Sequence, residues 1–360
     1  MKKIFSTITY IAAAIAVIGC AKTETIGPND AYKRYFDAWM QVNHPDAKAS
    51  GLGIYIIDDK QGSGAAVGEE GYILLDYKAT DLEGNISSST DAVTAQQLGT
   101  YSATDYYGPK FLTTTKTTLP AGLRDALVGQ PIGTSRKVII PSWLMSYKDY
   151  DSETDYLDPP IGKNDEYDAS SYSNTIYEFT IADYTEDIEQ WQIDSIGRFF
   201  KNTTVKIDSK LAADVFKGMT AADSTSLGFY YKQLKAPKDT EEFAKDTTVY
   251  INYVGKLLNG LVFDTNIERV AKDNNLYSTS ASYAPMRINW GENYEDITMG
   301  SDKGSVISGF AQTLWQMKAM EKGVGVFYSN LGYGYSGSGS NIPAYAPLIF
   351  EIELVEKPEE

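Results

Sequence analysis

The chain is poor in the side chains that carry out nucleophilic or metal-dependent chemistry. It contains one cysteine, Cys20, and one histidine, His44, in 360 residues. A catalytic triad needs an imidazole beside its nucleophile, and a zinc site is usually built from several cysteine or histidine ligands. The glycine-rich stretch 332–340 is not closed by the Gly-Lys-Ser/Thr sequence of a phosphate-binding loop. The sequence therefore predicts no nucleophilic enzyme, no metal site and no bound cofactor.

Carboxylates gather in one segment, and their chemistry would suit calcium. They are Asp149, Asp151, Glu153, Asp155 and Asp158. A calcium loop also carries a glycine at a fixed position among its oxygen ligands. Residues 149–158 contain no glycine. We therefore interpret this segment as a solvated acidic loop and keep a calcium site as the alternative.

Cys20 lies at the end of an N-terminal sequence that is typical of export. Two lysines precede an apolar run, 4–18, which is shorter than the roughly 20 residues needed to span a bilayer. A short apolar run behind basic residues indicates a secretory signal. The run ends in Val-Ile-Gly-Cys at 17–20, which resembles the lipobox of bacterial lipoproteins. We expect residues 1–19 to be removed and Cys20 to be lipidated, with palmitate among its acyl groups; an ordinary signal with a chance cysteine is the alternative.

The lipid on Cys20 would attach the protein to the cell envelope. Residues 20–30 are polar and contain glycine and proline, which indicates a flexible tether. Neither Ala21 nor Lys22 is an acidic signal for retention at the inner membrane. We therefore expect the outer membrane, on its periplasmic or its surface-facing side.

Composition and charge limit the partners. The formal net charge of −16 opposes binding to nucleic acid and to anionic lipid headgroups. The chain has 42% hydrophobic and 22% charged residues, which is typical of a globular protein. A single cysteine allows no disulfide within the chain, so stability must come from buried apolar surface.

Three segments of the C-terminal half carry an ordered set of aromatic, aliphatic and glycine residues. Segment 252–265 runs from Asn-Tyr-Val-Gly to Phe-Asp-Thr, and segment 304–310 reads Gly-Ser-Val-Ile-Ser-Gly-Phe before Met317. Segment 331–350 contains Leu-Gly-Tyr-Gly, Asn-Ile-Pro and a closing Leu-Ile-Phe. In this order and at this spacing, the segments resemble the FKBP-type peptidyl-prolyl cis-trans isomerases. The resemblance covers residues 227–357 and implies an α+β fold, in which a curved antiparallel sheet wraps on a short helix.

The activity that the resemblance implies is rotation about the bond before proline in unfolded or proline-containing polypeptides. This rotation faces a barrier of about 18–20 kcal/mol because amide resonance is lost when the bond twists. The twisted amide has less charge separation than the planar one, so a dry apolar pocket favours the transition state. Such a pocket needs apolar walls and one or two hydrogen-bond donors, and no cofactor.

The resemblance assigns roles to the matching residues. Phe310 would be the floor of the pocket, where the family more often has the larger tryptophan, so activity would be reduced or retuned. Asp264 would accept hydrogen bonds from groups of the pocket wall, and Arg269 is its candidate partner. The Tyr333 hydroxyl and the Ile342 backbone N–H would donate to the substrate. The lining is expected from Tyr253, Phe263, Val306, Ile307, Phe310 and Phe350.

Segment 270–297 is longer than the corresponding part of a minimal domain of this family. It is rich in aromatic side chains, among them Tyr277, Trp290 and Tyr294. We interpret it as an insertion beside the mouth of the pocket. It would serve as a lid, as a surface that grips client chains, or as a contact with the other half.

The elements that position these residues occur twice along the chain. Apolar residues at helical spacing predict a helix at the start of each half, and apolar runs predict strands after it. These elements lie at 32–40, 51–57, 72–79 and 176–181 in the first half, and at 188–200, 227–231, 249–255 and 348–354 in the second. Recurrence in the same order indicates a duplicated unit. We expect two tandem FKBP-like α+β domains, 31–186 and 187–360, each with an extra N-terminal helix.

The first copy keeps the scaffold but has lost the site. Ser87 and Ser88 stand where the second copy has its Phe-Asp pair, and Leu123 stands at the floor. Tyr147 would match the donor tyrosine, and Tyr177 would replace the phenylalanine of the closing strand. We predict that this copy is not catalytic and either binds chains or supports the second copy.

Two functions remain open. The first is an envelope-tethered prolyl isomerase that assists the folding of other envelope proteins. The second is a non-catalytic chaperone or binding lipoprotein on the same scaffold. The Phe-Asp pair favours the first, and the small Phe310 floor and the incomplete first copy favour the second.

Overall fold

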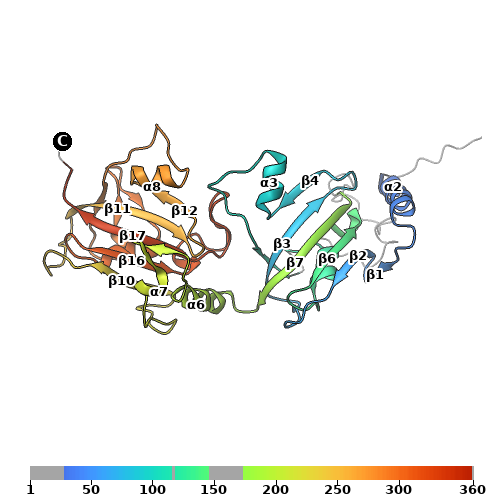
Figure 1. Ribbon diagram of the computed structural model, residues 1–360, viewed down its shortest axis with the longest axis horizontal. Helices are drawn as coiled ribbons and strands as arrows, with labels where there is room; N and C mark the ends of the chain where they lie inside the picture. The colour runs from blue at the N-terminus through green and yellow to red at the C-terminus, as the bar shows by residue number, and fades with distance from the viewer. Residues whose placement is uncertain (1–27, 116–117, 146–172, 359–360) are drawn as a thin grey trace, which may run out of the picture.

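The computed structural model of the protein describes residues 28–115, 118–145 and 173–358 (Figure 1). The export signal, Cys20, Tyr147 and the acidic segment 149–158 lie outside the described residues. Within the described ranges, no helix has the length and apolar character needed to cross a bilayer. The fold is α+β, as expected, and the described residues form one large antiparallel sheet in each half of the chain and a two-stranded sheet in the second half.

The N-terminal sheet has seven strands in the order β1-β2-β6-β7-β3-β4, with β5 also paired to β3. Its strands are β1 (Ala49–Ser50), β2 (Ile54–Lys60), β3 (Tyr72–Thr80), β4 (Ile86–Ser89), β5 (Lys110–Thr113), β6 (Ser135–Ile140) and β7 (Thr175–Thr185). Among the described residues of this half, the helices are α2 (Pro28–Asn43), α3 (Ala92–Leu98), α4 (Ala121–Leu127) and the 3₁₀ turn η2 (Ser142–Met145).

The C-terminal sheet has eight strands in the order β10-β16-β17-β11-β13-β14-β15, with β12 also paired to β11. Its strands are β10 (Phe229–Lys235), β11 (Thr248–Leu257), β12 (Val262–Thr265), β13 (Met286–Asn289), β14 (Thr298–Met299), β15 (Gly304–Ser305), β16 (Lys322–Phe327) and β17 (Leu348–Val355). The other elements are α6 (Ile188–Phe199), the hairpin β8 (Lys206–Ile207) and β9 (Lys210–Leu211), α7 (Ala212–Val215), α8 (Glu268–Asp273), η4 (Tyr294–Asp296), α9 (Ser308–Trp315) and η5 (Ser329–Leu331).

The two sheets share one pattern of strand pairing. In the first half, β7 lies between β6 and β3, and β3 also pairs with β4 and β5. In the second half, β17 lies between β16 and β11, and β11 also pairs with β12 and β13. The register agrees as well, because Ala79 faces Tyr177 as Gly255 faces Phe350. The division into domains at 31–186 and 187–360 stays a prediction.

One helix packs on the inner face of each sheet and another on the outer face. Helix α4 belongs to the inner core of the first half, and α9 belongs to that of the second. Helix α2 places Phe36 and Met40 against Ile139 on the outer face of the first sheet. Helix α6 contributes Ile196 and Phe199 to a larger outer core in the second half. The helices predicted around 32–40 and 188–200 are therefore confirmed.

Two predicted segments differ in the structure. The tether was expected to reach residue 30, but α2 begins at Pro28; proline suits the first turn of a helix because its missing N–H has no partner there. The segment 270–297 is in part a component of the sheet, because β13 pairs with β11. Ile288 and Trp290 are buried in the inner core. Apolar residues on β13 therefore have a structural role that the insertion hypothesis missed.

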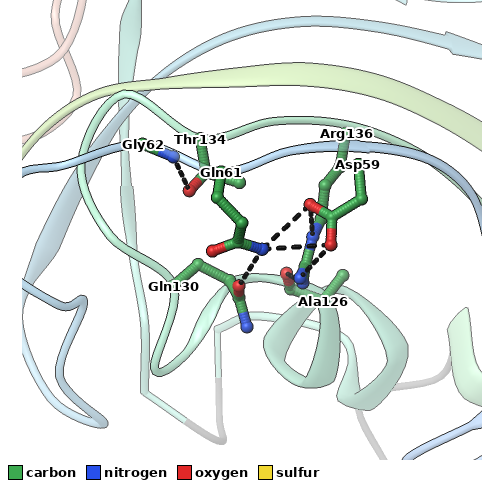
Figure 2. A network of polar contacts seen from close by, with 7 residues as sticks. All are labelled: Asp59, Gln61, Gly62, Ala126, Gln130, Thr134 and Arg136. Atoms are coloured by element: carbon green, nitrogen blue, oxygen red, sulfur yellow. Dashed lines mark hydrogen bonds and ion pairs between the residues drawn. The ribbon is translucent and has the colours of Figure 1, made fainter.

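A partly buried ion pair joins three elements of the first half (Figure 2). The Arg136 guanidinium, on β6, donates to both carboxylate oxygens of Asp59, on β2, at 2.9 Å each. Its third contact is the Ala126 carbonyl in α4, at 3.1 Å. Hydrogen bonds from Arg136 hold the pKa of the Asp59 carboxyl below its usual value. At the same register position the second half has Gly323, which leaves room for the ring of Tyr231.

Candidate active site of the C-terminal half

Four aromatic rings converge between the sheet and α9. Phe350, on β17, lies 5.0 Å from the ring of Phe310, on α9, and 5.6 Å from that of Phe263, on β12. Tyr253, on β11, lies 5.8 Å from Phe310 and 6.3 Å from Phe350. The three phenylalanines are buried, and Val306 and Ile307 pack against the same core. The structure thus brings the predicted lining residues together around an apolar centre.

Glycine and asparagine residues on neighbouring segments make this convergence possible. A Cβ at Gly255 would lie 2.6 Å from the ring of Phe263, so only glycine allows the rings to approach β11 there. Asn266, which follows β12, is buried and accepts a hydrogen bond from the Tyr253 N–H at 2.8 Å. Its amide nitrogen donates to the carbonyls of Ile251 and Ala284. Asn266 therefore fixes the strand that carries Tyr253, a role that sequence reasoning missed.

Asp264 lies at the rim of the ring cluster, where its carboxylate affects the hydroxyl groups of Tyr253 and Tyr333. The Tyr253 hydroxyl donates to the Asp264 carboxylate at 2.9 Å. Burial, and then the neighbouring Asp264 charge, raise the pKa of Tyr253 above its usual value. Burial and the same carboxylate also raise the pKa of Tyr333. Both hydroxyls therefore keep their protons at neutral pH, and Tyr333, with 36% of its surface exposed, is accessible to a substrate.

Two predicted roles are wrong in the structure. The Arg269 side chain is 89% exposed and has its ionic partner, Asp273, one turn further along α8 at 4.0 Å. Asp273 is its i,i+4 neighbour on the same helix face, and no ion pair joins Arg269 to Asp264 among the described residues. The Ile342 N–H donates to the Ser338 carbonyl at 3.1 Å and is therefore already used within its own loop. The Ile342 side chain is buried in the core that contains Phe310 and Phe350.

A different backbone donor borders the ring cluster. The N–H of Ile307 has no hydrogen-bond partner among the described residues. Ile307 is the N-cap of α9, the helix that carries Phe310, and its side chain is partly buried in the same core. Backbone N–H groups at a helix start are commonly left without an intrahelical partner. The start of a helix at the Val-Ile pair was the signal that would have found this donor.

Comparison with known proteins finds a family match in the same half of the chain. A family model described as FKBP-type peptidyl-prolyl cis-trans isomerase matches residues 239–355. An FK506-binding protein of Neisseria meningitidis is 30% identical over 116 residues, which are 32% of this chain and 84% of that protein. The chain belongs to the FKBP-type peptidyl-prolyl cis-trans isomerase family.

Other members of the FKBP-type family are matched over a smaller share of their length. A probable FKBP-type isomerase of Haemophilus influenzae is 31% identical over 147 residues, which are 41% of this chain and 49% of that protein. The chain thus spans about half of that relative. The solved structure of the three FKBP domains of wheat FKBP73 covers 84% of this chain and 93% of its own at 14% identity. Its TM-score of 0.26 is too low to support a conclusion about the fold.

The family model begins at residue 239, and the N-terminal half lacks the FKBP-type pair of Phe and Asp. Ser88 faces Ala79 on β3 as Asp264 faces Gly255 on β11, so serine occupies the register position of the carboxylate. The neighbouring Ser87 hydroxyl donates to the Ala79 carbonyl at 3.1 Å. Within the described ranges, no group of three His, Cys, Asp or Glu residues is placed to hold a metal ion.

Proposed function

We propose that this protein is a peptidyl-prolyl cis-trans isomerase and that its site lies in the C-terminal half. The observation that carries the proposal is the convergence of Phe263, Phe310 and Phe350 on one apolar centre, with the Tyr253–Asp264 hydrogen bond at its rim. Membership of the FKBP-type family supports it.

The site residues would accelerate the rotation by surrounding the proline bond with an apolar environment. The proline ring of the substrate packs against the ring cluster formed by Phe263, Phe310 and Phe350, where water is excluded. An amide that loses its resonance also loses charge separation, so it is less penalised by a dry site than the planar amide is. The Tyr333 hydroxyl and the Ile307 N–H donate to substrate carbonyls and hold the flanking chain while the bond turns. The hydrogen bond from Tyr253 keeps Asp264 oriented at the rim.

The test is proline-limited refolding of a substrate protein in the presence of the full-length chain. We expect the wild type to accelerate refolding, and Phe263→Ala to lower kcat/KM about tenfold or more, since it removes a wall that contacts the twisting bond. Asp264→Ala should lower it as well. Phe243→Ala, which removes a phenylalanine that packs on Trp290 in the same half, is the matched control and should retain activity. Wild-type rates in both site variants would rule out isomerisation in this pocket.

The double variant Phe263→Ala/Asp264→Ala also tests the first half. Because Ser87 and Ser88 replace the Phe-Asp pair there, refolding should fall to the uncatalysed rate. Turnover close to the wild-type rate in the double variant would show that the first half has a site of its own.

We propose that the protein works at the cell envelope on the folding of envelope proteins, attached through a lipid on Cys20. The basic and apolar N-terminal sequence that ends in Val-Ile-Gly-Cys supports this location.

A second candidate is a non-catalytic binding role on the same scaffold. It is favoured by the serine pair of the first half, which leaves a scaffold without its site. The full-length chain would then suppress aggregation of an unfolded client as well in the Phe263→Ala form as in the wild type. Loss of that suppression in Phe263→Ala would assign it to the isomerase pocket instead.

A further inference from the structure

The loop 338–347 carries Ile342 and is closed by hydrogen bonds of its own backbone. The Ser338 and Ile342 backbones exchange hydrogen bonds of 2.9 and 3.1 Å. The Tyr345 N–H donates to the carbonyl of Gly334, next to the donor Tyr333, at 2.9 Å. The loop therefore joins the Ile342 side chain, which is buried in the core that contains Phe310 and Phe350, to the segment that carries Tyr333.

The same loop is contacted by the N-terminal half. Figure 1 shows the segment before β17 beside the segment that joins α3 to β5. The Ser340 hydroxyl donates to the Asp105 carboxylate at 2.7 Å, and the Tyr106 N–H donates to the Ser340 carbonyl at 2.9 Å. The Tyr106 side chain packs against the inner core of the C-terminal half. These contacts join residues more than 230 positions apart in the chain, since the separation of Asp105 and Ser340 is 235.

Aromatic packing forms the second part of this contact. The ring of Tyr345 meets that of Tyr72, on β3, edge-on at 5.2 Å, and that of Phe111, on β5, at 6.0 Å. Phe111 in turn packs edge-on against Trp191 of α6 at 4.7 Å. Edge-to-face pairs contribute energy beyond the area that they bury. The N-terminal half therefore contacts the loop at two separate residues, Ser340 and Tyr345.

We propose that Asp105 and Tyr72 of the N-terminal half are positioning residues for the site of the C-terminal half. They hold loop 338–347 in the conformation that sets the Ile342 wall and keeps Tyr333 in place. A loop that is ordered before the substrate arrives spares binding the entropic cost of ordering it. The half without a Phe-Asp pair thereby completes a site that it does not itself contain. This inference rests on the proposed isomerase function.

The contact should affect substrate binding more than the chemical step. Phe263, Phe310 and Phe350 lie on β12, α9 and β17, and the contact residues Asp105 and Tyr72 belong to the other half. The centre that favours the twisted amide should therefore survive when the loop is released. The contacts with the chain that flanks proline should weaken.

The experiment uses the full-length chain and measures KM, kcat and hydrogen–deuterium exchange of the amides at 338–346. Asp105→Ala and Ser340→Ala should each raise KM about two- to tenfold, as loss of one hydrogen bond does, and should leave kcat within about twofold. Both variants should speed exchange in the loop. Because they break the same hydrogen bond, their combination should be no worse than either alone. Tyr72→Ala breaks the other contact, and its effect should add to theirs.

Two further variants separate positioning from general stability. Asp105→Asn retains an oxygen that accepts from Ser340, so it should restore KM and exchange to near the wild-type values. Asp58→Ala removes an exposed aspartate of the same half that lies away from the loop, and should change neither quantity. A fall of kcat together with a rise of KM and a lower Tm in Asp105→Ala would indicate a structural role and overturn the proposal.

The exchange measurement keeps this proposal distinct from the proposed function. Absence of turnover in the wild type would overturn the isomerase function alone. In that case faster loop exchange in Asp105→Ala, with Asp58→Ala unchanged, would still support positioning by the N-terminal half. Unchanged exchange and unchanged KM in both Asp105→Ala and Tyr72→Ala would overturn it.

Discussion

At the scale of single residues, the rim of the site is controlled by one carboxylate. Asp264 accepts the hydrogen bond of Tyr253 and raises the pKa of both Tyr253 and Tyr333 in addition to the effect of burial. A phenol with a raised pKa remains a donor where an ordinary tyrosine begins to ionise. Both hydroxyls should therefore remain donors near pH 10, where an ordinary tyrosine is half ionised.

The raised pKa of Tyr253 predicts a specific pH dependence of stability. An unfolded tyrosine ionises near pH 10. The folded pKa is higher, so above about pH 10 the folded state binds more protons than the unfolded state, and the free energy of unfolding falls as pH rises. Below that pH the contribution is fully present. Urea unfolding of Tyr253→Phe between pH 8 and 11 should show a shallower decline than the wild type does.

Tyr335→Phe is the control for this measurement, because Tyr335 has 77% of its surface exposed in the same half. Its pH profile should follow that of the wild type. Parallel profiles for Tyr253→Phe and the wild type would contradict the assignment of the raised pKa to Tyr253.

At the scale of elements, the helix under each sheet approaches it through a glycine. In α9, a Cβ at Gly309 would lie 2.3 Å from the ring of Phe327, on β16. In α4, a Cβ at Gly122 would lie 2.4 Å from the side chain of Ile140, on β6. The floor residue follows the glycine in each case, as Phe310 and Leu123. The close approach of helix and sheet therefore sets the depth of the floor.

Gly309→Ala should weaken both stability and activity. Inserting a methyl group where Phe327 cannot yield costs about 1–3 kcal/mol of the free energy of unfolding. The shift of α9 displaces Phe310, so kcat/KM should fall in the refolding assay. Gly304→Ala is the matched control, because a Cβ there meets only the Met299 carbonyl oxygen at 3.7 Å. Equal effects of the two substitutions would argue against close packing as the cause.

In the first half, the Arg136–Asp59 pair joins two neighbouring strands, β2 and β6 (Figure 2). Asp59→Ala would leave the Arg136 guanidinium, with 7% of its side chain exposed, without its carboxylate. Removing one partner of a buried ion pair is strongly destabilising. Because Asp59 is partly exposed, we expect the free energy of unfolding of this half to fall by about 2–4 kcal/mol. Hydrogen exchange of the amides in β2 and β6 measures this loss.

Asp58→Ala, one residue earlier on the same strand, is the control and should have little effect. The lowered pKa of Asp59 adds a pH test. The stabilisation by the pair is present above the unfolded pKa of aspartate, near 3.9, and should disappear as pH falls further. A wild type that loses no more stability in acid than Asp59→Ala would contradict this account.

At the scale of the whole molecule, the two halves share strand order but differ in how their outer faces are covered. Helix α2 buries one end of the first sheet around Ile139, whereas α6 and α7, with the β8–β9 hairpin, bury a larger part of the second. The contact at loop 338–347 then joins the first half to the rim of the second. The two halves therefore combine the same pattern of strand pairing with different surroundings.

The anchor is the prediction that concerns the molecule in its cell. Cys20→Ser removes the only thiol that can accept the lipid. The variant should lose incorporation of labelled palmitate and move from the membrane fraction to the soluble envelope fraction. Its refolding activity should be unchanged, because Cys20 is not one of the residues that form the proposed site. Continued membrane association of Cys20→Ser would contradict the lipid anchor.

Much of the fold was predictable because it depends on local pattern. The spacing of apolar residues along 32–40 and 188–200 predicts helices, since side chains three and four positions apart share a helix face. The order and spacing of the aromatic motifs likewise predicted that Phe263, Phe310 and Phe350 would meet. The number of residues between these motifs matches the family pattern, and this spacing can be read directly from the sequence.

The tertiary structure alone decided which polar groups are free and which are already paired. The Ile342 N–H is used by Ser338, Arg269 has Asp273 as its neighbour, and Ile307 keeps a free N–H among the described residues. Hydrogen bonds depend on angles and on fractions of an ångström, which composition and spacing do not encode. The contact of Asp105 with Ser340 spans 235 positions. The sequence by itself therefore determined the family and the aromatic centre, and only the folded chain decided the donors and the support of the loop.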